Sequence, residues 1–540
     1  MLSCPDHRVA QFRDILIWPV QIRPGFSSES IPRIHQQMTA GGQWRLLDDE
    51  FPDDPAEFQE RHYKEFVAFL PYVQRFLYGE GVSGAEHTPG RSAPVTVYRR
   101  TDVDRLRITL RPDSAPIELQ VAHVDLYFFL DMDVALLNVE VAAENLPLAT
   151  AHELLYRFGR AYPTGWDQAG QGLHNPARAT LLDRQGRELA SSDPANKARY
   201  LEFVCRHRAP CVSQMWSWLL QPFVPDHDDT PGELRFRLIE YYRMPLMAYL
   251  ALENPRALTR DDFIRFGFVA NLPAHDPIPR KDPAVIRFER LHCEDRFWTD
   301  SEAGPNSRFI CTGNALLLIG EADSPFFCNA ETGLLARFRH QYFLLFLITH
   351  FHRAALLSFS DRLASAVNEL DIRNSESVRQ FKRRIRQSFE SFLRFTHRYW
   401  FHEVSEQGLV QSLFERTARQ LRNDELFDEV KEQVREMSAY LDSDSQRRQS
   451  GTVLRLTVVT IFGLVATVVT GYFGMNLFDF GAAPQTTKLV QMASVTGLTV
   501  ALVLFTVARS KRLSDFLEAL SDERLTLPSK WAAFTQVFKR

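Results

Sequence analysis

Hydrophobic and polar positions follow two different periods along the chain. Up to about residue 330, apolar runs of strand length alternate with helical patterns. Strands are expected at Asp14–Ile22, Val95–Arg100, Leu106–Leu110, Ile117–Val121, Leu126–Leu130 and Val134–Val141, with later runs at Phe309–Cys311 and Ala315–Ile319 returning to the same sheet. Helices are expected at Glu57–Leu70, His152–Arg160, Asn196–Leu220 and Leu234–Leu252. This alternation predicts an α/β domain over residues 1–330, with α+β as the alternative.

From residue 331 onward the pattern is helical throughout. Glu331–Leu370 is one continuous segment rich in large apolar residues. Two further apolar stripes recur at helical spacing, namely Val378, Phe381, Ile385, Phe389, Phe392 and Tyr399, and then Phe427, Val430, Val434, Met437 and Leu441 with Asp444 and Arg448. The pattern predicts a long helical stalk over residues 331–452 that continues into the next segment. Gly451 and the polar stretch 443–450 are the places where it could break.

Two uncharged runs follow near the C-terminus, Leu456–Phe478 and Leu489–Ala508. Each reaches the roughly 20 residues that a helix needs to cross a bilayer. They predict a two-helix transmembrane hairpin, with spans at 453–476 and 489–508 joined by an extracytoplasmic loop at 477–488. A hairpin buried in a globular core is the alternative, which two such runs in succession disfavour.

The basic residues around the hairpin predict its orientation. Six flank the two runs, whereas the connecting loop carries only Lys488; the flanking residues are Arg447, Arg448, Arg455, Arg509, Lys511 and Arg512. By the positive-inside bias, both termini face the cytoplasm, and residues 509–540 form a basic cytosolic tail. The protein is therefore expected in the cell membrane, which is the inner membrane in a Gram-negative bacterium.

The composition of the chain argues against several classes of function. The chain has 540 residues and a formal net charge of -4, which argues against a dedicated nucleic-acid binder. Its six cysteines contain no C-x-x-C pair, so they are expected as reduced, mostly buried thiols of a cytosolic domain. The N-terminus shows no signal-peptide pattern. His350 and His352, and His397 and His402, are badly spaced for chelation, and no nucleophile–base arrangement stands out, so an enzyme is not predicted.

Polar and small residues recur along one side of the first span. Positions 457, 460, 464, 467 and 471 follow 3-and-4 spacing and place hydroxyls and a glycine on one face; the residues are Thr457, Thr460, Leu464, Thr467 and Gly471. Such residues also serve ordinary helix packing in lipid, which is the alternative interpretation. Because two spans cannot enclose a water path, a pore requires a homo-oligomer. Leu464 would then form a hydrophobic constriction.

The first span ends in Tyr472-Phe473-Gly474-Met475-Asn476, before a short loop and one more span. This arrangement resembles the signature of the CorA-like metal ion transporter family, and the resemblance covers about residues 420–512. It implies a homopentamer in membrane lipid whose first spans line one pore, with Gly474, Met475 and Asn476 ringing the outer mouth. It also implies a cytosolic funnel that senses Mg²⁺. The predicted cargo is Mg²⁺, with no permanently bound cofactor.

The predicted ring of Gly474, Met475 and Asn476 carries no charge, and this suits magnesium. Mg²⁺ dehydrates reluctantly, so the Asn476 amide oxygen and backbone carbonyls suit a hydrated ion that must leave again. Asp442 and Asp444, three to four turns below the span, are candidate regulatory Mg²⁺ ligands, or otherwise a solvated helix end. The acidic clusters at 48–54 and 226–229 are expected as surface loops.

Departures from the family pattern keep other cargoes open. The loop continues with Leu477-Phe478-Asp479-Phe480 in place of an acidic segment, Val465 stands near the usual mid-span proline, and Gln449 or Ser450 replaces an inner asparagine. Zinc, cobalt or nickel transport is therefore one alternative. A membrane-anchored sensor or enzyme is another, and a pocket with perturbed titratable groups in residues 1–330 would favour it.

Overall fold

The computed structural model describes residues 7–23, 30–47, 60–79, 94–129, 132–240, 242–270, 283–299, 304–371 and 374–474, with scattered positions between 484 and 505. The chain divides into two compact units, Met1–Val434 and Arg435–Arg540. The helical region predicted as a stalk from residue 331 is therefore divided, because its part up to Val434 belongs to the first unit.

One mixed sheet forms the centre of the first unit. The described strands are β1 Arg8–Arg23, β2 Trp44–Leu46, β3 Val95–Arg100, β4 Arg105–Thr109, β5 Ile117–Phe129, β6 Val134–Pro147, β7 Arg178–Leu182, β8 Glu188–Ser191, β9 Val224–Pro225, β10 Arg235–Leu238, β11 Leu246–Leu252, β12 Cys293–Glu294, β13 Arg308–Cys311 and β14 Ala315–Glu321. Their main order is β12-β13-β14-β11-β1-β6-β5-β4-β7-β8. Most neighbours are antiparallel, and β11 pairs with β14 in parallel.

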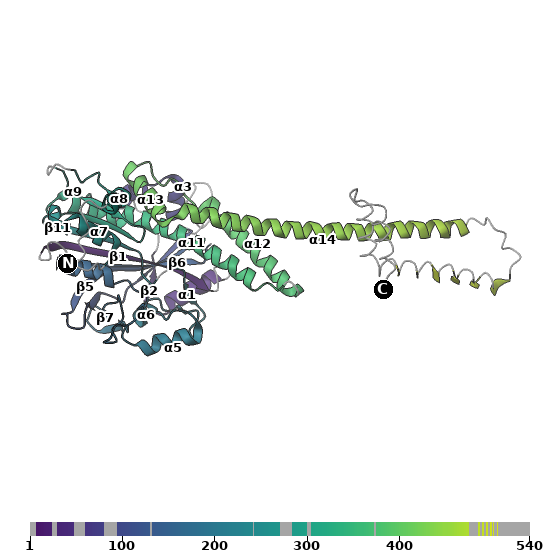
Figure 1. Cartoon of the computed structure of the whole chain (residues 1–540), viewed down its shortest axis with the longest axis horizontal. Helices are drawn as coiled ribbons and strands as arrows, with labels where there is room; N and C mark the ends of the chain where they lie inside the picture. Colours follow the sequence, from purple (N-terminus) through teal and green to yellow (C-terminus); the bar gives the residue numbers. More distant parts are fainter. Residues whose placement is uncertain are drawn as a thin grey trace. The chain divides into compact units, whose positions relative to one another are not determined.

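Helices cover this sheet and then dominate the rest of the chain (Figure 1). They are α1 Ser30–Ala40, α2 Glu60–Phe66, α3 Pro71–Tyr78, α4 Leu148–Arg157, α5 Lys197–His207, α6 Gln214–Leu219, η1 Pro255–Ala257, α7 Arg260–Phe268, α8 Pro283–His292, α9 Pro325–Cys328, α10 Leu334–Arg337, the π-helical turn η2 Phe338–Tyr342, α11 Phe343–Asn368, α12 Ser375–Arg398, α13 Gly408–Leu421 and α14 Asn423–Gly474. The predicted α/β domain followed by a helical region is confirmed.

Strand β1 shows how the two faces of the sheet are used. Leu16 points toward the turn after α4, where its side chain lies against Gly159, whereas Gln21 donates to Ser358 of α11 at 3.1 Å. Even and odd positions of a strand face opposite sides, so α4 and α11 lie on opposite faces of the sheet. Both faces are buried, and this is why β1 and β6 are apolar along most of their length.

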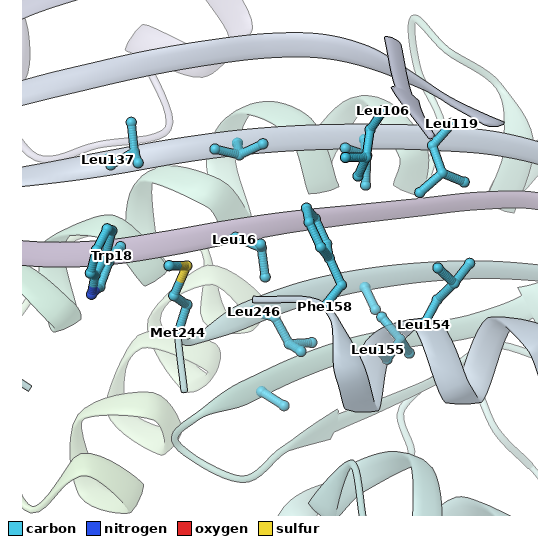
Figure 2. Packing of buried hydrophobic residues seen from close by; sticks show 14 of the residues in the cluster. Leu16, Trp18, Leu106, Leu119, Leu137, Leu154, Leu155, Phe158, Met244 and Leu246 are labelled. Atoms are coloured by element: carbon cyan, nitrogen blue, oxygen red, sulfur yellow. The ribbon is translucent and has the colours of Figure 1, made fainter. Parts of the chain in front are cut away.

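The packing on the α4 face joins residues that are distant in sequence. Figure 2 shows Leu154, Leu155 and Phe158 pointing from the α4 region toward the strands that carry Leu16 and Leu246, and all five are buried. Each such side chain contributes about 1.5–3 kcal/mol relative to an exposed one. The core of the first unit thus holds β1, β11 and the α4 region together.

The opposite face is closed by the most apolar helix of the first unit. The helical stretch Leu334–Asn368 is long and apolar enough to cross a membrane, but 83% of its most apolar window is buried inside the protein. Phe351 stacks on Phe129 of β5 with ring centroids 3.9 Å apart. Length and composition alone do not distinguish such a core helix from a span, and its burial assigns it to the core.

One secondary-structure prediction was wrong. Leu234–Leu252, expected as a helix, forms strands β10 and β11. Pro245 interrupts any helix there, and the seven residues of β11 are all buried between β1 and β14. A fully buried strand is a continuous apolar run, which periodicity cannot tell from a buried helix.

Smaller differences have local causes. Asn196–Leu220 is two helices, because Pro210 lies between α5 and α6. The two strands expected in 117–130 are one strand, β5, with an irregularity between Val121 and His123. The five described cysteines carry free thiols, and Cys211, Cys293 and Cys311 are buried as predicted. Burial raises the pKa of Cys211 to about 11, so this thiol is unreactive at neutral pH.

Candidate functional site

The candidate ion pathway is built on one helix. Helix α14 runs without interruption from Asn423 to Gly474, 52 residues, or about 78 Å at 1.5 Å per residue. It contains no proline, and Asp424 and Glu425 in its first turn complement the helix dipole. The predicted continuity is confirmed, since the stretch 443–450 and Gly451 are helical. Helix α14 is therefore a single rod that joins the end of the first unit to the predicted pore mouth.

The sequence-predicted pathway residues share one side of this rod. At about 100° per residue, positions 457, 460, 464, 467, 471 and 474 fall within an arc of about 100°. Thr457, Thr460 and Thr467 are exposed in the single chain, as is Gly471. The side chain of Leu464 lies outside the described residues. So do Met475 and Asn476, whereas Gly474 is the last residue of α14.

The threonine hydroxyls are satisfied inside the helix. Thr457 donates to the carbonyl of Val453 at 2.9 Å, Thr460 to Leu456 at 2.8 Å and Thr467 to Gly463 at 2.8 Å. A hydroxyl that donates to its own backbone has only acceptor capacity left. The outward side of this face therefore offers oxygen lone pairs, which attract cations, and no acidic or basic side chain occurs between Leu456 and Gly474.

Two glycines of α14 are not required by contacts within the chain. A Cβ built on Gly463 or Gly471 meets no atom of the described structure within 4 Å. In membrane helices, glycines allow neighbouring backbones to approach closely. The neighbour that would use this space is not among the described parts of the chain.

The two candidate regulatory residues occupy different sides of α14. Positions 442 and 444 are two residues apart on a continuous helix, so their backbone directions differ by about 200°. Position 442 falls on the side of the threonine face, whereas position 444 continues the stripe of Val430 and Val434, which are buried in the first unit. The two residues therefore cannot act as one pair of ligands on one face. Their side chains lie outside the described residues.

The second predicted span is described only in part. Leu489, Val490 and Leu498 are helical and more than 60% exposed, as expected for lipid- or subunit-facing positions. The rest of 489–508 and most of the loop 477–488 lie outside the described residues, so the hairpin and the orientation of the termini stay predictions.

The other candidates that the sequence offered do not gather into a site. His350 and His352 are both buried in α11, and His352 donates its Nε2–H to the Tyr399 carbonyl at 2.5 Å. Burial lowers the pKa of each to about 3, so both are neutral. Asp226 pairs with Arg237 and Asp229 with Arg206, as in an ordinary surface loop, and the cluster 48–54 lies outside the described residues. The described part of the chain holds no group of three metal-ligating side chains.

Sequence reasoning missed a pocket in the first unit. A cavity of about 550 Å³ lies between the loop after β4 and residues 167–177. Arg111, Arg157 and His174 line it, with Tyr156, whose hydroxyl hydrogen-bonds to His174. Burial and then the nearby Arg160 and Arg157 lower the pKa of His174. Its residues come from the end of α4 and from loops without a motif, so no signal in the sequence could have located it.

Residues 358–512 match a family model described as CorA-like Mg2+ transporter protein. The proteins of that family are membrane-associated transporters of divalent cations. The match covers less than a third of the chain and includes α12, α13, α14 and the second predicted span. The resemblance read from Gly474-Met475-Asn476 is thus confirmed at the level of the family. No curated protein matches the chain.

Proposed function

We propose that several copies of this chain form a pore through which Mg²⁺ enters the cell, driven by the membrane potential. The observation that carries the proposal is the hydroxyl-bearing, uncharged face of α14, which ends at Gly474 of the Gly-Met-Asn motif. Copies arranged with this face inward would line a water path with oxygen acceptors. The family's pentamer, with the first span inside and the second outside, is the arrangement we adopt.

The energetics suit passive entry. Moving a divalent ion through 100 mV releases about 4.6 kcal/mol, at about 2.3 kcal/mol per charge. This is on the order of a thousandfold in concentration. The predicted ring of Asn476 amide oxygens is neutral, so a hydrated Mg²⁺ can bind it and leave again, whereas a ring of carboxylates would hold the ion.

Flux into sealed proteoliposomes tests the proposal. We expect Mg²⁺ uptake that increases with an inside-negative potential and is lost in Asn476→Ala and in Gly474→Ala. Val459→Ala, which removes an apolar group from another side of the same helix, is the matched control and should retain uptake. Uptake indifferent to the potential would contradict a passive pore. Entry of Zn²⁺, Co²⁺ or Ni²⁺ with Mg²⁺ excluded would change the cargo and keep the pore.

The pocket at Arg111, Arg157 and His174 favours a second candidate function, that of a membrane-anchored sensor. It combines a volume suited to a small molecule with a histidine of perturbed pKa. A folded protein that shows no flux of any divalent ion, but whose thermal stability rises with a small anionic metabolite, would support this function over transport.

A further inference from the structure

Helix α12 concentrates positive charge. Its 24 residues, Ser375–Arg398, contain seven lysines and arginines and two glutamates, whereas the whole chain has a net charge of -4. In Figure 1 the helix lies beside α11, within the first unit. The rest of the chain is thus weakly acidic, and α12 is a local exception.

The apolar side of α12 is already used. Phe392 packs against Phe359 of α11 with ring centroids 5.4 Å apart, and against Phe427 of α14 at 5.7 Å. Phe381, Ile385 and Phe395 are buried as well. This side cannot insert into a bilayer or a partner, so any interaction of α12 must use its polar side.

The polar side is a row of arginines. Arg379, Arg383, Arg386 and Arg394 are exposed and follow helical spacing along one line, with Glu390 as the acidic residue on that line. Arg379 pairs with Glu376 at 3.7 Å in an exposed contact of little strength. Arg383, Arg386 and Arg394 form no ion pair or hydrogen bond with any described residue. We call these four arginines the α12 arginine row.

The row differs from the other arginines of the first unit, many of which have carboxylate partners. Arg99 is held by Asp125 through two hydrogen bonds of 2.7 and 2.8 Å, and Arg237 by Asp226 at 2.7 Å. The guanidinium groups of Arg383, Arg386 and Arg394, which have no carboxylate partner among the described residues, retain their capacity for bidentate contacts with phosphate groups.

We infer that the α12 arginine row binds the anionic headgroup surface of the membrane in which the chain is anchored. A lipid surface demands charge alone, whereas a protein partner would need an apolar centre, and the row offers only Leu393 at its edge, 40% exposed. Because the chain carries its own anchor, the headgroups are present at high effective concentration. The inference rests on the proposed function only through the cytoplasmic placement of the first unit, since the cytoplasmic leaflet is the anionic one.

Energy transfer to labelled lipid measures this contact directly. The full-length protein, with Cys4 and Cys205 replaced by Ser, carries a donor fluorophore at Gln387→Cys, an exposed position beside the row. It is reconstituted into nanodiscs with an acceptor on the headgroups, either in phosphatidylcholine alone or with about one third phosphatidylglycerol. We expect greater transfer in the anionic discs, which falls to the neutral level when salt is raised from about 50 to about 500 mM.

Charge removal identifies the residues. R383Q/R386Q/R394Q should lower the surface-binding constant on the order of a hundredfold, about fivefold for each arginine, and abolish the difference between the two discs. R184Q/R287Q/R290Q removes the same charge from exposed arginines that form no ion pair with the described residues, and it should retain the difference.

Equal transfer in both discs, or an equal loss in the two triple variants, would overturn the inference. So would protection of the fluorophore from a soluble quencher that is independent of lipid and salt, because the row would then be covered by another copy of the chain. The readout is lipid proximity and not ion flux, so a failed pore proposal and a failed lipid inference give different results.

Discussion

Two long apolar helical segments of this chain have opposite surroundings. The helix Leu334–Asn368 is 83% buried in its most apolar window, packed between the sheet and α12. The last part of α14 has a similar composition, yet Val453 and Leu456 are 62% and 67% exposed in the single chain. The first segment satisfies its apolar surface within its own unit. Val458 is buried, but the other described apolar residues of the second segment leave surface exposed in the single chain. This surface has to be covered by lipid or by further copies, which is what a pore-lining span requires.

The largest expected effect tests the buried member of this pair. Phe351→Ala removes a fully buried ring that stacks on Phe129, so it should lower the free energy of unfolding of the first unit by about 3–5 kcal/mol. The measurement is denaturant unfolding in detergent followed by tryptophan fluorescence. Val453→Ala, in the exposed member, should change this value by less than about 0.5 kcal/mol. Equal losses in the two variants would mean that both segments belong to one core.

A second prediction concerns a carboxyl group that is buried in the first unit. Asp14 of β1 is fully buried, and burial raises the pKa of this carboxyl to about 8, against a smaller opposing effect of Arg243. The folded state therefore holds a proton that the unfolded state releases above its ordinary pKa near 4. The resulting stability is present at low pH and is lost as pH rises toward 8.

Between pH 5 and 7 this group should lower the free energy of unfolding of the wild type by roughly 2–3 kcal/mol, at about 1.4 kcal/mol per pH unit. Asp14→Asn should remove that part of the slope, as measured by unfolding at several pH values. Between Leu456 and Gly474 the pathway face of α14 holds no titratable side chain, so Mg²⁺ flux through an intact protein should not share this dependence. An unchanged slope in Asp14→Asn would show that Asp14 is ionised in the folded state.

The sequence predicted those features that rest on local periodicity and failed where tertiary packing decides. Helix α14 was predicted because its stripe of Phe427, Val430 and Val434 leads into an uncharged run without proline. Strand β11 was mistaken for a helix because burial on both sides removes the alternation that marks a strand. The pocket around His174 depends on the end of α4 and on loops that only the folded chain brings together.

The set of α14 positions that share one face could be predicted from the sequence alone, for a physical reason. A lining face of one helix is fixed by the 3.6-residue repeat alone, so the spacing of Thr457, Thr460 and Thr467 sufficed. The internal hydrogen bonds of these hydroxyls, which turn the face into a set of acceptors, depend on the side-chain rotamers, which the spacing does not determine. The ring at Met475 and Asn476 stays a prediction.

A third prediction exchanges a hydroxyl between faces of the exposed segment. Thr460→Val replaces an acceptor oxygen on the pathway face with a methyl group of nearly equal volume, and should reduce Mg²⁺ flux about tenfold while unfolding of the first unit stays unchanged. Val459→Thr puts a hydroxyl about 100° away on the same helix and should leave flux within about twofold. Larger loss from Val459→Thr than from Thr460→Val would place the pore axis on another side of α14.

The smallest expected effect is a difference between Asp442→Ala and Asp444→Ala, the substitutions of the two aspartates below the span. On a continuous α14, position 442 shares the side of the threonine face, and position 444 shares the side of the buried Val434. If copies meet along the threonine face, Asp442→Ala should weaken inhibition of flux by internal Mg²⁺ severalfold, and Asp444→Ala should leave it nearly unchanged. Flux measured at graded internal Mg²⁺ distinguishes the two variants. The reverse result would mean that α14 turns a different side to its neighbours below the membrane than within it, and that the buried stripe continues as the contact between copies.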